Sequence, residues 1–344
     1  MRLDGRRESS NVEDRRGMSG GAKAGLGIGG VIIAALIAWI SGGDPISAGL
    51  EALQNNIESS KNEADTNSHE IWLYKCENCG YSIIGKIDPE LCENCKSVQS
   101  FQKIKKLGEE QHKQGNTEVG EENFTKEEQA LASDCKKILA STEDVWTPVF
   151  EQMGGTYTPP TLVLFSNQVN SACGSATAAV GPFYCSGDQK LYIDLSFFTQ
   201  MKRQLGVEGN TFAYAYVIAH EIGHHVENLT GTLGKAHQAM NQSDKVTANQ
   251  ISVRLELLAD YYAGVWAHYE EQMNHSMEYG DLEKGLELAK AIGDDWLQKK
   301  AQGRATPESF THGTSDQRKR WLKRGFETGD MRTSTFSVQN YNDL

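Results

Sequence analysis

The segment VIAHEIGHHV (217–226) contains the residues with the clearest chemical potential. His220 and His224 are four residues apart, so on an α-helix both imidazoles project from one face and can hold one zinc ion. Glu221 lies between them, close enough to act on a metal-bound water. His225 is rotated by about 140° from His220 on a helix, so we exclude it as a ligand. The pattern predicts a catalytic zinc site, and the alternative is a helix with two surface histidines.

A second apolar segment, RLELLADYYAGVW (254–266), contains Glu256 and Asp260, again four residues apart. A carboxylate among apolar side chains is costly unless it is paired or bound to a metal ion. Glu256 can complete a zinc site of two histidines and one glutamate, which leaves a fourth position for water. Asp260 on the same face can accept the free N–H of a ligand imidazole. The alternative is an exposed acidic stripe.

Four of the seven cysteines form two C-x2-C pairs separated by twelve residues: Cys76, Cys79, Cys92 and Cys95. Two such turns can direct four thiolates at one Zn or Fe ion. The surrounding residues resemble the rubredoxin-like module of rubrerythrins, and a structural zinc ribbon is equally compatible. Four unrelated thiols or two disulfides are the alternative.

Helices and a few strands must position the predicted catalytic residues. Periodicity and capping patterns predict a helix over 125–153, a strand over 161–166, two strands within 181–198 joined at 186–189, and helices over 210–229, 244–275, 281–300 and 315–327. The predicted fold class is α+β, a mostly helical domain with a small β-sheet. We expect the strand LYIDLSFF (191–198) to offer an edge to an extended peptide.

The stretch 24–43 has no charged residue, and about twenty helical residues span a bilayer core of roughly 30 Å. It follows a segment with several arginines, which predicts a single-pass anchor with a cytoplasmic N-terminus and an extracytoplasmic catalytic domain. A cleaved signal peptide is the alternative. The 344 residues include 34 Lys+Arg and 46 Asp+Glu, a net charge of −12, which argues against a nucleic-acid partner.

The expected organisation follows from these segments. It comprises a cytoplasmic segment 1–23, a transmembrane helix 24–43, a tether 44–70, the four-cysteine module 71–100, a linker 101–124, a zinc metallopeptidase domain 125–330 and a tail 331–344.

The HExxH…ExxxD pattern resembles the gluzincin peptidases, and the chain as a whole is similar to the YpfJ-like neutral zinc metallopeptidase family of bacterial membrane proteins. The matching stretches include GRRESSNVEDRRG (5–17), GPFYC (181–185), VIAHEIGHHV (217–226) and FTHGTSDQR (310–318). The resemblance covers the N-terminal segment and most of 125–330, and the four-cysteine module departs from it as an insertion. It implies a zinc-dependent peptidase without naming a substrate.

The resemblance to gluzincins also suggests that His312 stabilises the tetrahedral oxyanion. The alternative is a loop histidine bonded to a helix terminus. Cys173 and Cys185 flank a short loop and could form a disulfide in an oxidising compartment, or could be two free thiols, which leaves Cys135 unpaired.

The sequence therefore predicts a membrane-anchored zinc metalloendopeptidase that hydrolyses a peptide or protein substrate. Zinc would polarise the scissile carbonyl and activate water, with Glu221 as general base. One alternative is an inactive zincin that serves as a membrane-tethered binding module. Another is an electron-transfer protein whose function resides in a rubredoxin-like iron site.

Overall fold

The chain divides into two compact units, residues 1–43 with 119–344, and residues 44–118. The structure, a computed structural model, describes residues 1–17, 69–76, 82–85, 101–110, 124–177, 180–198, 201 and 211–344. The proposed membrane segment and three of the four module cysteines, Cys79, Cys92 and Cys95, lie outside the described residues. In the part that is described, no helix combines the length and apolar character needed to cross a membrane.

The first unit contains a four-stranded mixed sheet in the order β1-β5-β9-β8. β1 (Val12–Asp14), β5 (Thr161–Phe165) and β9 (Lys190–Asp194) are parallel, and β8 (Phe183–Cys185) pairs antiparallel with β9. A separate hairpin joins β6 (Gln168–Ser171) to β7 (Gly174–Thr177). β8 is therefore the edge strand at the end of the sheet opposite β1.

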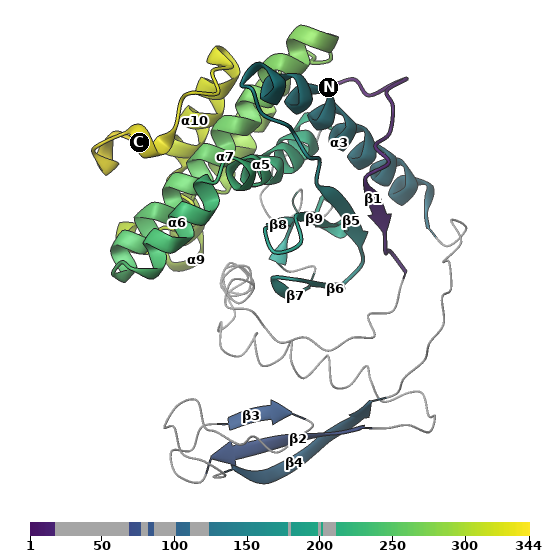
Figure 1. Ribbon diagram of the computed structural model, residues 1–344, viewed down its shortest axis with the longest axis vertical. Coiled ribbons are helices and arrows are strands. Elements are labelled where there is room, and N and C mark those ends of the chain that lie inside the picture. Colours follow the sequence, from purple (N-terminus) through teal and green to yellow (C-terminus); the bar gives the residue numbers. More distant parts are fainter. Residues whose placement is uncertain are drawn as a thin grey trace. The chain divides into compact units, whose positions relative to one another are not determined.

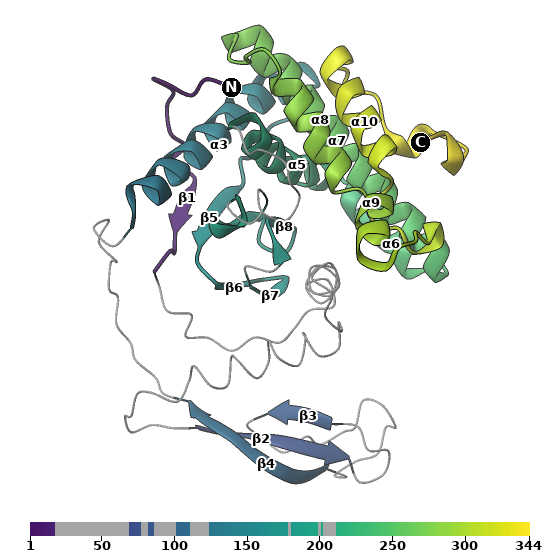
Figure 2. The same ribbon diagram turned by 180° about the vertical axis from the view of Figure 1, so that it is seen from behind.

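Helices account for most of this unit: α3 (Lys126–Gln152), α5 (Thr211–Leu229), α6 (Thr232–Asn241), α7 (Lys245–Asn274), α8 (Asp281–Ala291), α9 (Asp294–Gln302) and α10 (Ser315–Thr328). Short 3-10 helices cover Pro307–Ser309, Thr335–Ser337 and Tyr341–Asp343. Figures 1 and 2 show α5 beside the sheet, with α7 and α10 beyond it. One apolar core joins α3, α5, α7, α8 and α10 to strands β5 and β9, so the predicted mostly helical α+β class is confirmed.

A glycine brings the two helices with the predicted ligands together. A Cβ on Gly223 of α5 would lie 2.7 Å from the Ala259 carbonyl oxygen of α7, so a larger residue would force the helices apart. Gly223 lies one residue before the predicted ligand His224, where a small residue could also be read as leaving room beside a metal ion. The structure gives a different reason, which is close packing of α5 on α7.

Several elements differ from the expectations. The helix expected over 281–300 is two helices, α8 and α9, interrupted at Gly293, where a Cβ would lie 2.3 Å from the Ser315 backbone nitrogen. The helix α6 and the hairpin β6–β7 were not expected. The strand β9 is paired on both sides, by β5 and β8, so the expectation that 191–198 offers a free edge is wrong. In the described part of this sheet, the outer strands are β1 and β8.

The second unit contains an antiparallel sheet in the order β3-β2-β4. Its strands are β2 (His69–Cys76), β3 (Ser82–Gly85) and β4 (Phe101–Glu110). The expected linker 101–124 thus begins with a strand, whose charged sequence gives little of the alternation that predicts one. Cys76 is the last residue of β2.

Candidate metal centre

Three side chains from α5 and α7 converge on one point. His220, His224 and Glu256 each offer a ligand atom, and these atoms all lie within 4.8 Å of one another. Nε2 of His220 lies 3.3 Å from one Glu256 carboxylate oxygen, and Nε2 of His224 lies 3.5 Å from the other. The side chains remain partly accessible, Glu256 at 18%. The structure thus brings together the three residues that the sequence predicted as catalytic ligands.

The separations fit the donor set of a zinc site. Zinc ligands at about 2.0–2.1 Å in a tetrahedron lie roughly 3.3–3.4 Å from one another. The two nitrogen-to-oxygen distances at Glu256 are 3.3 and 3.5 Å, each to a different carboxylate oxygen, and the three ligand atoms lie within 4.8 Å of one another, so His220, His224 and Glu256 are close enough to hold one zinc ion. Two imidazoles and one carboxylate form a common set of protein ligands at catalytic zinc sites.

A buried carboxylate fixes the orientation of His220. The Nδ1–H of His220 donates to Asp260 at 2.9 Å, which leaves Nε2 directed at the centre. Asp260 is fully buried and also accepts two bonds from Arg318, at 2.8 and 3.0 Å, and one from Tyr216 at 2.6 Å. Burial alone would raise the pKa of Asp260, but Arg318 and His220 lower it to about 2. Asp260 is thereby an ionised acceptor behind His220, as the sequence suggested.

A second carboxylate, absent from our sequence prediction, orients His224. The Nδ1–H of His224 donates to Glu227 at 2.9 Å, one helical turn further along α5. Glu227 is fully buried, and burial raises its pKa to about 7. Its spacing of i, i+3 from His224 is visible in the sequence, but nothing local shows that it faces inward.

Glu221 lies on the same helix as the histidines, next to the edge strand β8. The backbone N–H of Tyr184 in β8 donates to the Glu221 carboxylate. Burial raises the pKa of Glu221, and the imidazoles of His220 and His224 oppose this effect. The carboxylate of Glu221 is therefore held between the centre and the free edge of the sheet.

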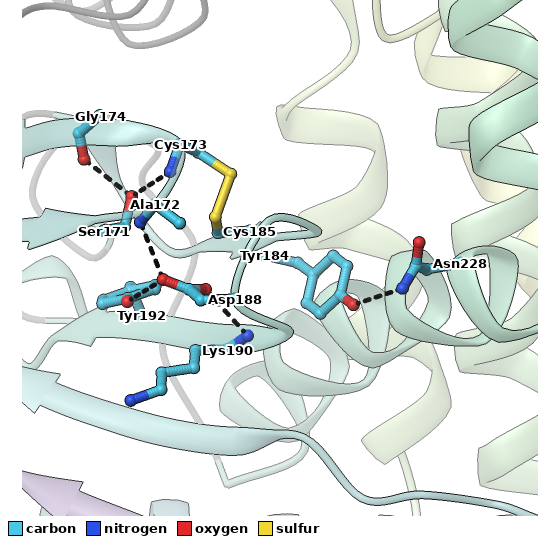
Figure 3. Close-up of a disulfide and its surroundings, with 10 residues drawn as sticks. All are labelled: Ser171, Ala172, Cys173, Gly174, Tyr184, Cys185, Asp188, Lys190, Tyr192 and Asn228. Carbon is cyan, nitrogen blue, oxygen red and sulfur yellow. Dashed lines mark hydrogen bonds between the residues drawn. A yellow bond between two sulfur atoms is a disulfide. The ribbon is translucent and has the colours of Figure 1, made fainter.

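A disulfide between Cys173 and Cys185 ties β8 to the β6–β7 hairpin, with 5.8 Å between the two Cα atoms (Figure 3). Tyr184, the residue before Cys185, reaches α5. Its hydroxyl accepts a hydrogen bond from the Asn228 side chain at 3.1 Å. The edge strand is thus anchored to a hairpin on one side and to the helix α5 on the other. Cys135 is a buried free thiol, and burial raises its pKa.

His312 lies in the loop before α10, where Asp294 holds it in place. One carboxylate oxygen of Asp294 accepts the backbone N–H groups of Thr311, His312 and Gly313 at 2.6–3.1 Å, and the other lies 3.3 Å from the His312 ring. Burial would lower the pKa of His312, but Glu256 and Asp294 raise it. His312 is thus close enough to the centre to interact electrostatically with Glu256, although the described contacts include no direct bond between them.

His225 has another role, consistent with its exclusion as a ligand. Its Nε2–H donates to the Thr158 carbonyl at 2.7 Å, and its Nδ1 accepts the Tyr184 hydroxyl at 2.9 Å. The ring is fully buried, and burial lowers the pKa of His225 to about 4. The neutral imidazole therefore links α5 to β8 and to the loop before β5.

We expect His225 to make folding sensitive to mild acid. Because its folded pKa lies below the unfolded value of about 6.5, the unfolded chain binds the proton first, and stability falls as the pH drops from about 6.5 towards 4. The total loss is about 3 kcal/mol. Denaturant unfolding of the metal-free protein at pH 7 and pH 4.5 should show this loss, and His225→Gln should show a smaller one. Equal pH dependence in the two proteins would contradict the assignment.

Residues 94–336 match the family described as "Putative neutral zinc metallopeptidase". The chain belongs to this metallopeptidase family. It is 39% identical over 337 residues to the uncharacterized protein YpfJ of Escherichia coli K12, covering 96% of each chain. It is 43% identical over 216 residues to the uncharacterized protein Rv2575 of Mycobacterium tuberculosis H37Rv, covering 59% of this chain and 71% of that one. No solved structure matches the chain significantly.

Membership of the metallopeptidase family agrees with the resemblance read from the sequence and with the cluster of His220, His224 and Glu256. The buried partners that complete the centre were mostly missed. Arg318, Tyr216, Glu227 and Asp294 were not predicted, because each acts through a ligand or through His312.

Proposed function

We propose that this protein is a zinc-dependent endopeptidase with His220, His224 and Glu256 as metal ligands. The observation that carries the proposal is the convergence of these three donors within 4.8 Å of one another, with Glu221 on the same helix as the two histidines. Family membership supports a peptide substrate.

The chemistry divides between the metal and the chain. Bound zinc supplies Lewis acidity, which polarises a carbonyl and lowers the pKa of water. Glu221 takes the proton of the attacking water and later delivers it to the leaving amine nitrogen. The Tyr184 N–H restrains this carboxylate, which interacts electrostatically with both ligand imidazoles.

The edge strand β8 is the candidate site for the substrate backbone. It pairs with β9 on one side only, and the Tyr184 N–H already points away from β9 towards Glu221. An extended peptide that pairs with this edge would pass along the centre, with main-chain hydrogen bonds giving affinity with little dependence on sequence.

Metal removal tests the function directly. Casein and a library of quenched fluorescent peptides should be cleaved by the purified protein, and a zinc chelator should abolish cleavage until zinc is restored. His224→Ala should lose the catalytic metal and the activity, whereas His275→Ala, at an exposed position, should keep both. Cleavage that persists in His224→Ala, or a metal-loaded protein that cleaves nothing, would overturn the proposal.

We propose that His312 donates a hydrogen bond to the oxyanion and that Asp294 positions it. His312→Ala is expected to lower kcat by about 10²–10³-fold with metal content unchanged. Asp294→Asn should lower kcat less, because it weakens the support of the ring and leaves the ring in place.

The double variant separates positioning from a general structural effect. If Asp294 acts through His312, Asp294→Asn should add little to the loss already caused by His312→Ala, although the two single effects are each measurable. Fully multiplicative losses would indicate that Asp294 acts independently of His312. Circular dichroism and metal content of each variant show whether the fold and the centre are intact.

Two further parts of the sequence prediction stand as proposals. The cysteines at 76, 79, 92 and 95 would hold structural zinc or iron, and metal analysis of wild type against Cys76→Ser tests this. Visible thiolate-to-iron charge-transfer bands would favour the rubredoxin-like alternative, and a colourless zinc preparation would count against it. Attachment to a membrane through residues 24–43 predicts that the chain stays with membranes after a carbonate wash.

A further inference from the structure

The N-terminal residues are built into the same body as the metal centre. β1 pairs in register with β5, so Val12, Glu13 and Asp14 lie opposite Leu162, Val163 and Leu164. The backbone bonds continue on both sides of this pairing, from Leu162 N–H to Asn11 and from Arg15 N–H to Leu164. The side chains of Met1 and Leu3 are buried in the main core. In Figure 1 this segment runs along α3 into the sheet.

Arginine from this segment neutralises a buried carboxylate on α7. Glu270 is 1% exposed and accepts hydrogen bonds from both terminal nitrogens of Arg6, at 2.6 and 3.2 Å. Hydroxyls of Ser141 and Ser276 donate to the same carboxylate. In the described part of the chain, Arg6 is the one cation paired with Glu270. Without it, a carboxylate would be buried with no counter-charge, which is strongly destabilising.

The same arrangement recurs on α3. Glu143 is buried and accepts bonds from Arg7 at 2.9 Å, from the Ser9 hydroxyl at 2.5 Å and from the Asn11 amide at 2.8 Å. All three donors come from the N-terminal segment. Two helices of the first unit, α3 and α7, therefore contain buried carboxylates whose arginine partners come from the N-terminal segment.

The end of the described N-terminal segment also contacts the residues at the start of α3. The guanidinium of Arg16 lies 4.3 Å from the centre of the Phe124 ring and donates to the Glu128 carbonyl at 3.2 Å. Arg16 is at the end of the described N-terminal segment, and Phe124 immediately precedes α3. The uncharged stretch 24–43 falls between these two contacting points.

We propose that residues 1–17 and the metal centre lie on the same side of any membrane that the stretch 24–43 enters. A single crossing between residues 17 and 124 would place two parts of one sheet on opposite sides of a bilayer. This revises the topology expected from the sequence, a cytoplasmic N-terminus with an extracytoplasmic catalytic domain. Two of the arginines that suggested a cytoplasmic N-terminus instead pair with buried carboxylates of the first unit, Arg6 with Glu270 and Arg7 with Glu143.

A double-mutant cycle tests whether the N-terminal segment is docked in the full chain. Arg6→Met should lower the Tm of the peptidase unit by about 5–15 °C. In a Glu270→Gln background the same substitution should lower Tm much less, because no buried charge is left unpaired. Arg2→Met, at an exposed position, is the matched control and should leave Tm nearly unchanged. Equal effects of Arg6→Met in both backgrounds would overturn the docking.

Sidedness is tested by labelling two exposed serines that are changed to cysteine, Ser10→Cys in the N-terminal segment and Ser337→Cys in the peptidase unit. Cells that produce either full-length variant are treated with a membrane-impermeant maleimide before or after permeabilisation, and mass spectrometry quantifies the modified peptide. A cytoplasmic protein serves as the control for cell integrity. The two positions should react in parallel under both conditions. One position that reacts in intact cells while the other requires permeabilisation would overturn the proposal.

Discussion

Glu221→Gln is expected to lower kcat by about 10²–10⁴-fold while the protein keeps its metal. Glutamine has nearly the same shape and can still contact the Tyr184 backbone, so the edge strand should stay in place. It cannot accept a proton from water at any pH of interest. The loss should therefore fall on kcat, with KM for a peptide substrate little changed.

The measurement combines steady-state hydrolysis of a fluorescent peptide with metal analysis of the same preparation. Glu151→Gln, at the exposed end of α3, is the matched control and should behave as wild type. Activity retained in Glu221→Gln would mean that another group activates the water. Loss of metal together with activity would instead give Glu221 a role in holding the centre.

The ligand set could be predicted from the sequence because its spacing is local. His220 and His224 repeat at one helical turn, and so do Glu256 and Asp260, within segments apolar enough to be buried. Each pair therefore occupies one face before any tertiary contact is known. The step that spacing could not establish was that the two faces meet, which depends on the close approach at Gly223.

The supporting residues could not be predicted in this way. Arg318 is 58 residues from Asp260, and Asp294 is 18 residues from His312, with helix boundaries between them. Periodicity gives the face of a helix on which a residue lies, but it does not identify a partner on another element. Asp294 and Arg318 therefore looked like ordinary charged residues at helix starts.

The N-terminal strand was missed for a related reason. β1 has three residues, two of them acidic, and it precedes a long uncharged stretch. In the sequence, the arginines of the N-terminal segment have the character of flanking charges of a membrane anchor. Their actual partners, Glu143 and Glu270, lie more than 130 residues further along the chain.

Arg318→Met is expected to lower the free energy of unfolding by about 3–5 kcal/mol and to weaken metal binding by about 10–100-fold. Arg318 donates two charge-assisted hydrogen bonds to the Asp260 carboxylate, and its guanidinium lies 3.9 Å from a carboxylate oxygen of Glu256. Methionine fills much of the same volume but leaves Asp260 buried without its cation. The pKa of Asp260 should then rise from about 2, because burial is no longer opposed by Arg318. A weakened acceptor behind His220 holds that ring less firmly.

Arg320→Met separates this effect from a general loss of positive charge on α10, because Arg320 lies two residues away and is exposed. It should change the free energy of unfolding by no more than about 0.5 kcal/mol. Arg318→Lys should fall between the two, since it keeps the charge but cannot make the paired bonds to Asp260. Denaturant unfolding without zinc measures the free energy of unfolding, and the additional stability in the presence of zinc measures the affinity for the metal. The prediction would be contradicted if Arg318→Met were as stable as Arg320→Met and bound zinc equally well. Asp260 would then not depend on Arg318, and the remaining contacts of His220 would orient its ring.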